Sequence, residues 1–146
     1  MIRHVLVALD GSEGSRKALK TAMDYVTRAQ TPKVTLVSVL PIGGGTFPLG
    51  FTQEVGIGKE YFEVLGARIQ EQLKKAKALL SGLPAEIDTH MLSGNPGDEI
   101  VAFAKENGIE MIFIGSRGRR RLRSHLLGSV SDRVVHHANC NVWVVH

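Results

Sequence analysis

The hydrophobic pattern divides the chain into short apolar runs that alternate with longer amphipathic stretches. The runs are rich in β-branched residues and bounded by turn residues, which is typical of strands buried on both faces of a sheet. One run is weaker because it contains Asp88, Thr89 and His90, and we expect it at a sheet edge, where one face meets water. The expected strands are residues 4–9, 34–40, 87–92, 111–114 and 141–145.

Between these runs, apolar residues recur every three or four positions, as they do in an amphipathic helix. Ser12 and Ser15 are candidate caps for the first helix, whereas Asn95 followed by Pro96 offers the third helix an N-cap and a favoured first-turn proline. Strands joined in this way by crossover helices predict one doubly wound α/β domain with a parallel sheet covered on both faces. The expected helices are residues 12–29, 61–80, 96–107 and 129–137, and the domain spans residues 1–146.

One segment does not fit the alternation. Residues 41–58 contain six glycines and two prolines and are too long for an ordinary connection. Two interpretations stay open, a mobile insert and a lid or partner-binding loop, since long loops over strand ends often carry function.

Composition favours a globular protein outside the membrane. The 146 residues are 43% hydrophobic and 22% charged, and no run approaches the roughly 20 apolar residues of a membrane helix. The chain begins directly with an apolar strand in place of a cleavable leader, so we expect a cytoplasmic protein. The single cysteine, Cys140, has no second thiol for a disulfide or a zinc pair, and we interpret it as a packing residue.

The candidate site is a glycine-spaced segment that leaves the fourth expected strand and enters the last helix. Gly115 and Gly118 are separated by two residues, and nine more precede Gly128 and Ser129. Glycines let the backbone approach an anion, and a helix N-terminus offers unpaired N–H groups with a partial positive charge. The spacing therefore predicts a phosphate cradle and a nucleotide ligand. The other known glycine signatures, G-x-x-x-x-G-K-[ST] and a G-x-G-x-x-G after the first strand, do not occur.

The net charge of +4 is concentrated in the same segment. Its arginines are expected either to bind phosphate oxygens or to form a solvated surface, and both interpretations stay open. Nucleic-acid binding is conceivable, but aromatic residues for base stacking are not interleaved with the basic run. The cluster comprises Arg117, Arg119, Arg120, Arg121 and Arg123.

The histidines and Asp10 have structural alternatives. His136 and His137 are adjacent on a helix and point about 100° apart, so we expect them at the surface and not as ligands of one metal. His125, in the glycine-spaced segment, is open between a ligand contact and a surface position. Asp10 is expected either to contact the ligand or to cap the first helix.

The glycine spacing after the strand MIFI, the opening VLVALDGS and the SGNP turn at residues 93–96 together resemble the nucleotide-binding branch of the universal stress protein family. The resemblance covers the whole chain. It implies a five-stranded parallel sheet in the order 3-2-1-4-5, a homodimer, and ATP bound where the first and fourth strands meet.

The resemblance also implies site residues. Ala8 and Asp10 would border adenine and ribose, with Ser12 in the same loop, and Val39 would pack against the base. Mg²⁺ would be held by the nucleotide phosphates and water. Gly115 would lie near the ribose and α-phosphate, and the backbone amides expected at the phosphates are those of Arg117, Gly118, Gly128, Ser129 and Val130.

The sequence favours a binding protein over an enzyme, because we find no positioned general base and no nucleophile triad. The expected function is that of an ATP-binding, homodimeric stress-response or signalling factor. An exposed apolar edge strand invites pairing with a second chain, so the dimer is expected through Val142, Trp143 and Val144. The alternatives are a slow ATPase or nucleotidyl-transfer enzyme, and a nucleotide-independent dimer that binds another anion or nucleic acid through its arginines.

Overall fold

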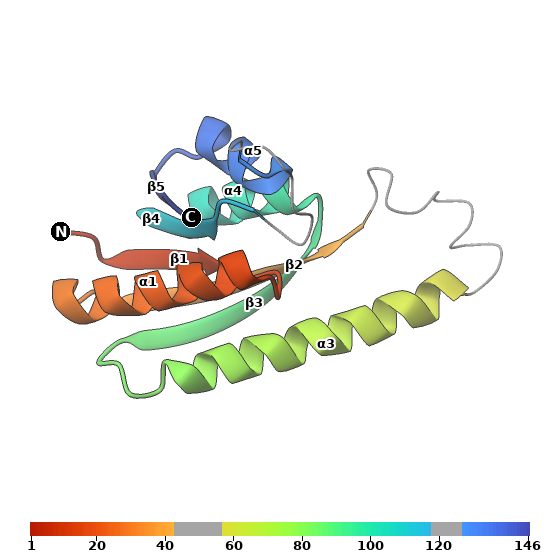
Figure 1. Cartoon of the computed structure of the whole chain (residues 1–146), viewed down its shortest axis with the longest axis horizontal. Coiled ribbons are helices and arrows are strands. Elements are labelled where there is room, and N and C mark those ends of the chain that lie inside the picture. Colours follow the sequence, from red (N-terminus) through yellow and green to blue (C-terminus); the bar gives the residue numbers. More distant parts are fainter. Residues whose placement is uncertain (43–56, 118–126) are drawn as a thin grey trace.

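The computed structural model describes residues 1–42, 57–117 and 127–146 (Figure 1). Most of the glycine- and proline-rich insert lies outside the described residues, as do Gly118 and His125. The same holds for all the clustered arginines except Arg117.

The strands form one parallel sheet in the order β3-β2-β1-β4-β5, which confirms the order implied by the family resemblance. Its strands are β1 (His4–Ala8), β2 (Lys33–Pro41), β3 (Glu86–Gly94), β4 (Met111–Gly115) and β5 (Asn141–Val145). The helices are α1 (Glu13–Ala29), α3 (Ile57–Leu79), α4 (Pro96–Glu106) and α5 (Ser129–His137).

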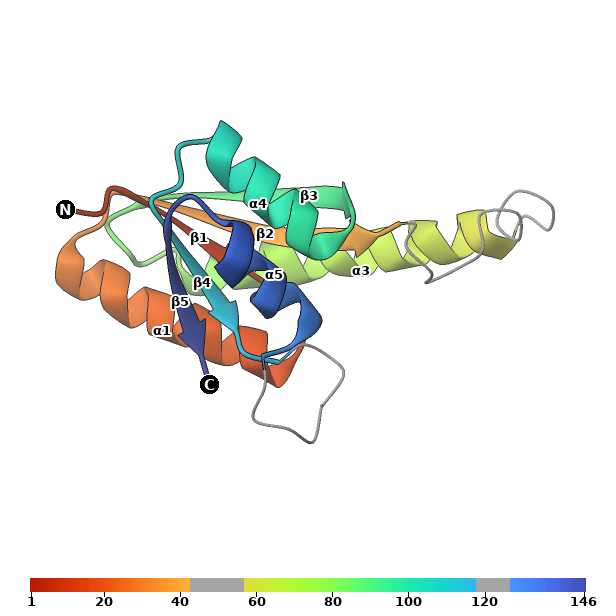
Figure 2. The ribbon, with the colours of Figure 1, turned by 90° about the horizontal axis from the view of Figure 1, so that it is seen from above.

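The helices cover both faces of the sheet (Figure 2), as the alternation predicts. Their buried side chains form two hydrophobic cores, one on each face. Successive side chains of a strand point to opposite faces. In β1, Val5 and Val7 pack with residues of α1 and α3, whereas Leu6 and Ala8 pack with residues of α4 and α5. All four side chains are buried, as expected for a strand at the centre of a parallel sheet.

Strand and helix boundaries differ from the sequence prediction where pairing or packing continues past the local pattern. The β2–β3 ladder runs from Lys33 opposite Glu86 to Pro41 opposite Gly94, so both strands are longer than expected. Helix α3 begins at Ile57, inside the segment assigned to the insert. The prediction that the polar third strand lies at an edge is confirmed, and β5 forms the other edge.

Candidate phosphate-binding site

Three helices with described N-caps begin at the carboxyl end of the sheet, and they differ in how those caps are made. In α1 the Ser12 hydroxyl accepts a hydrogen bond from the Ser15 amide at 3.1 Å. In α4 the Asn95 side chain accepts from the Asp98 amide at 3.1 Å, which confirms the predicted cap. Helix α5 has Gly128 as its N-cap and no side-chain cap hydrogen bond. The cap residue of α5 thus offers the first-turn N–H groups no side-chain acceptor of the kind that Ser12 and Asn95 provide in α1 and α4.

The start of α5 is held at the end of β4 by backbone bonds. The Gly128 amide donates to the Ser116 carbonyl at 2.6 Å, and the Ser116 amide donates to the Val145 carbonyl at 2.8 Å. Ser129 is exposed and Val130 is half-buried in the first turn that follows. The predicted residues Gly115, Gly128, Ser129 and Val130 are therefore brought to one end of the sheet.

Gly115 lies against α1 with no room for a side chain. A Cβ atom on Gly115 would be 2.6 Å from the carbonyl carbon of Gly14, and one on Gly14 would be 2.6 Å from the carbonyl oxygen of Arg117. Real Cβ atoms do not approach other atoms this closely, so both positions depend on glycine. The ribose contact predicted for Gly115 stays a prediction, because its close approach to α1 already accounts for the glycine.

Sequence reasoning did not single out Gly14. The available signal was a glycine in the first turn of a helix, where it lowers helix propensity and hence calls for a packing or functional reason. Its partner, however, lies about a hundred positions further along the chain. Ser116 and Ser131, whose atoms join β4 to α5, were not singled out either.

The turn after β1 places Asp10 just before the cap of α1. Asp10 Oδ1 accepts a hydrogen bond from the Ser12 amide at 2.8 Å, and Gly11 between them has a φ of 79°. The cap itself is Ser12, so the alternative that Asp10 caps the helix is wrong, and Asp10 stabilises the preceding turn. A nucleotide contact of Asp10 or Ser12 stays a prediction.

The other predicted residues are placed as follows. Ala8 is only 7% exposed, so it can offer a ligand little more than its backbone. Val39 is half-buried against the core beneath α4 and α5. Arg117 is exposed where the described part of the loop ends. The structure brings Ala8 and Gly115 to the ends of neighbouring strands, β1 and β4.

Helices α4 and α5 are linked beside the site. The Arg133 guanidinium forms an ion pair with Asp98, and a Cβ on Gly97 would lie 3.0 Å from the Cβ and Cδ atoms of Arg133. This contact places the capped N-terminus of α4 next to α5. His136 and His137 are exposed at the other end of α5, as predicted. Within the described residues, no cluster of three or more metal-ligating side chains occurs.

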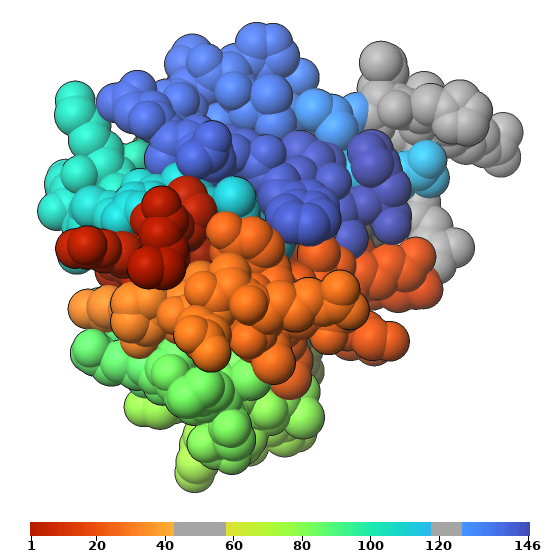
Figure 3. All heavy atoms as spheres, turned by 90° about the vertical axis from the view of Figure 1, so that its left-hand side faces the viewer, coloured from red at the N-terminus to blue at the C-terminus, as the bar shows by residue number. Residues whose placement is uncertain are grey.

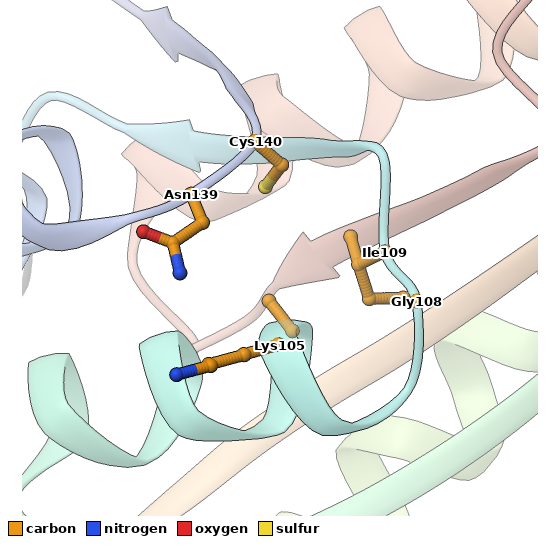
Figure 4. A pocket seen from close by; sticks show the side chains of 6 residues that line it. Lys105, Gly108, Ile109, Asn139 and Cys140 are labelled. Atoms are coloured by element: carbon orange, nitrogen blue, oxygen red, sulfur yellow. The ribbon is translucent and has the colours of Figure 1, made fainter.

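A pocket of about 190 Å³ lies at the opposite, amino end of the sheet (Figure 4). Cys140 lines it and packs against the core under α4 and α5, in agreement with the predicted packing role. Burial raises the pKa of the Cys140 thiol, which makes it a poor nucleophile. The lining residues are Ala104, Lys105, Gly108, Ile109, Asn139 and Cys140.

Polar side chains at the amino end of the sheet contact one another and form one connected group. The His4 ring lies 2.7 Å from the Thr35 hydroxyl, which donates to Asp88 at 2.6 Å, and the His90 ring lies 3.3 Å from the same carboxylate. Burial lowers the pKa of His4, and the Lys33 charge adds to this effect. Burial alone would raise the pKa of Asp88, but hydrogen bonds from Thr35 and His90 and nearby positive charge lower it overall.

Comparison with known proteins gives a consistent family match. The model of the universal stress protein family matches residues 1–146. A universal stress protein of Methanocaldococcus jannaschii is 33% identical over 147 residues, covering 99% of this chain and 82% of that protein. The protein YxiE of Bacillus subtilis is 33% identical over 153 residues, covering 99% of both chains.

Solved structures share the fold. The universal stress protein UspA from Lactobacillus plantarum superposes with a TM-score of 0.87 at 23% identity, covering 99% of this chain and 98% of that one. Two more distant matches contain nucleotides, one a universal stress protein in complex with cAMP and the other an Arabidopsis thaliana protein with AMP bound. No helix among the described residues is long and apolar enough to cross a membrane.

Proposed function

Because the chain belongs to the universal stress protein family, we propose that it binds the phosphate of an adenine nucleotide at the N-terminus of α5. The observation that carries the proposal is the glycine N-cap at Gly128, which has no side chain to accept hydrogen bonds from the first-turn N–H groups of α5. Helix N-termini of this kind favour anions through their N–H groups and their dipole. The AMP and cAMP complexes of related proteins support adenine as the base.

We propose ATP with Mg²⁺ as the ligand. The absence of a side chain at Gly128 and the exposed position of Ser129 fit a phosphate group, and Arg117 is an exposed cation on the strand side of the loop. Bound Mg²⁺ would neutralise phosphate charge, with its ligands drawn from the phosphates and water. The residues proposed for the adenosine side are Ala8, Asp10, Ser12 and Val39.

The proposed role is nucleotide-dependent binding without catalysis, as in a stress-response or signalling factor. In this role the protein has two conformations that bind a partner with different affinity. The nucleotide shifts the protein toward the conformation to which it binds more tightly, and so changes the affinity for the partner. Phosphate release from ATP at a rate above that of a Gly128→Ala variant would argue for the enzyme alternative.

The test of the ligand is a calorimetric titration with ATP and Mg²⁺, with AMP, and with adenosine as the control that lacks phosphate. We expect saturable binding of ATP and AMP, and adenosine binding weaker by about tenfold or more, since charge-assisted hydrogen bonds contribute about 1.5–3 kcal/mol each. Equal binding of adenosine and AMP would contradict a phosphate site at α5. Absence of binding to all three would favour a nucleotide-independent dimer.

We further propose that β5 pairs with β5 of a second copy. It is an edge strand, and its Trp143 is 43% exposed although the ring stacks on Phe113 at a centroid distance of 5.3 Å. Figure 3 shows the C-terminal residues at the surface beside α1. Edge strands with apolar residues pair readily with another chain. Val142 and Val144 are half-buried in the same strand.

Sedimentation of the wild type and of a Val144→Pro variant tests the dimer. Proline removes a backbone N–H and is disfavoured within strand ladders, so the variant should sediment as a monomer if β5 forms the interface. Trp143→Lys, which keeps the backbone donors, should weaken the dimer less. A wild type that sediments as a monomer at micromolar concentration would contradict this part of the proposal.

A further inference from the structure

The buried hydroxyl of Ser131 joins the first turn of α5 to the end of β4. Ser131 is 2% exposed, and its Oγ lies 3.0 Å from the Ser116 carbonyl oxygen and 3.0 Å from the Gly128 carbonyl oxygen. A hydroxyl has one proton to donate, and both neighbours are acceptors. The proton is therefore directed to, or shared between, these two carbonyls.

The Ser116 carbonyl also accepts the Gly128 amide, at 2.6 Å. A carbonyl oxygen has two lone pairs, so Gly128 and Ser131 together can satisfy it. Two donors from α5 thus meet one acceptor at the end of β4. The residues that flank the loop, 116 and 128, are held together by this pair of bonds.

A second buried serine offers an internal comparison. Ser15 is 5% exposed, and its hydroxyl lies 3.0 Å from the carbonyl of Ser12, the N-cap residue of α1. Ser131 makes the same contact with Gly128, the N-cap residue of α5, but it adds the bond to Ser116 on a different element. The local bond to the cap is common to both helices. The bond between elements distinguishes Ser131.

We propose that Ser131 is a positioning residue for the phosphate site, a proposal that rests on the function inferred above. Through Ser116 it sets the first turn of α5 against β4 before a ligand arrives. The N–H groups that would bind phosphate then need no reorientation on binding, and preorganisation of this kind raises affinity by removing an ordering cost. Ser131 itself is buried, and its hydroxyl is directed to backbone carbonyls and not to the ligand.

The experiment compares Ser131→Ala with Ser15→Ala, using amide hydrogen exchange and AMP titration. In Ser131→Ala we expect exchange of the Gly128 amide to become about five- to tenfold faster in the ligand-free protein and AMP affinity to fall by about three- to tenfold, the range for one lost hydrogen bond. Ser15→Ala should change neither quantity. Thermal unfolding of both variants checks that each is folded.

Two further variants test the hydroxyl itself. Ser131→Thr keeps the donor and should restore slow exchange at Gly128 and most of the AMP affinity. Ser131→Cys keeps the size but supplies a weaker donor, so its values should lie between those of the alanine variant and the wild type.

The inference is overturned if Gly128 exchange and AMP affinity in Ser131→Ala match the wild type, or if Ser15→Ala produces the same changes. A wild type that binds no AMP would contradict the proposed function and the affinity part of the inference. In that case the exchange measurement still decides whether Ser131 holds α5 against β4.

Discussion

Helices α4 and α5 begin at the same end of the sheet, yet their N-termini are built differently. Helix α4 has a side-chain cap from Asn95, a proline in its first turn, and the acidic residues Asp98 and Glu99 near its positive end. Helix α5 begins at Gly128 with no side-chain cap bond. A side-chain cap stabilises a helix by about 1 kcal/mol relative to alanine but by only roughly a few tenths of a kcal/mol relative to glycine, so α5 forgoes a small contribution that α4 has. The phosphate proposed at α5 would supply the acceptor that a glycine cap lacks.

The N-terminus of α4 also lies against the middle of α5, so the two helices are neighbours. The ion pair between Arg133 and Asp98 joins the helices, and Gly97 lets them approach. The difference in capping is therefore a difference between two adjoining helices of one layer, and variants at the two caps test whether it bears on ligand binding.

The largest expected effect comes from Gly115→Ala, at the end of β4 that adjoins α5. The added Cβ would lie 2.6 Å from the backbone of Gly14, so α1 or β4 must shift, at a cost of about 3 kcal/mol in the free energy of unfolding. Urea denaturation measures this loss. The matched control is Gly82→Ala, where a Cβ meets nothing within 4 Å. If the two variants are equally stable, the close approach of α1 and β4 is not needed.

Adding a side-chain cap to α5 should make its N-terminus resemble that of α4, more stable and less able to bind phosphate. Gly128 has a φ of −65°, which other residues adopt, so Gly128→Ser can supply a capping hydroxyl. We expect AMP affinity to fall by about tenfold because the hydroxyl competes with phosphate for the same N–H groups. The free energy of unfolding should exceed that of Gly128→Ala by about 1 kcal/mol. Unchanged AMP affinity in Gly128→Ser would contradict the proposal that the first-turn N–H groups of α5 bind phosphate.

Removing the side-chain cap of α4 should lower stability and leave AMP affinity unchanged. Asn95→Ala leaves the Asp98 amide without its acceptor and should lower the free energy of unfolding by about 1 kcal/mol. AMP affinity should stay at the wild-type value, because α4 is assigned no phosphate. Asn95→Asp, which keeps an acceptor, is the control. A loss of AMP affinity in Asn95→Ala would show that the α4 terminus belongs to the site.

The smallest expected effect is a change in the free energy of unfolding with pH. It distinguishes the helix caps, which do not titrate, from His4 at the amino end of the sheet. The pKa of His4 is lowered in the folded protein, so the unfolded chain binds more protons below about pH 6.5. The stabilising contribution of neutral His4 is present above about pH 6.5. It is lost as the pH falls through the pKa that His4 has in the folded protein. Neither Asn95 nor Gly128 titrates, so the stability difference between their variants should be the same at pH 7 and pH 5.5. His4→Gln should show a shallower loss over this range, and an unchanged slope would contradict the assignment to His4.

The sequence indicated the site through residues that act within a few positions of one another. Asn95 bonds to an amide three positions away, and α5 begins at Ser129, as the glycine spacing predicted. Capping and periodicity depend on neighbours along the chain, so they can be recognised without a structure. The polar residues around Asp88 likewise predicted an edge strand, since an edge needs only one buried face.

The contacts that hold the site together join residues distant in the sequence, and only the tertiary structure decided them. Gly14 and Gly115 need glycine because two remote backbones cross there, and no local pattern encodes that crossing. Ser131 bonds to Ser116 for the same reason, because the fold returns α5 to the end of β4. The pattern of side chains determined which elements form, whereas close packing between remote segments determined which atoms meet.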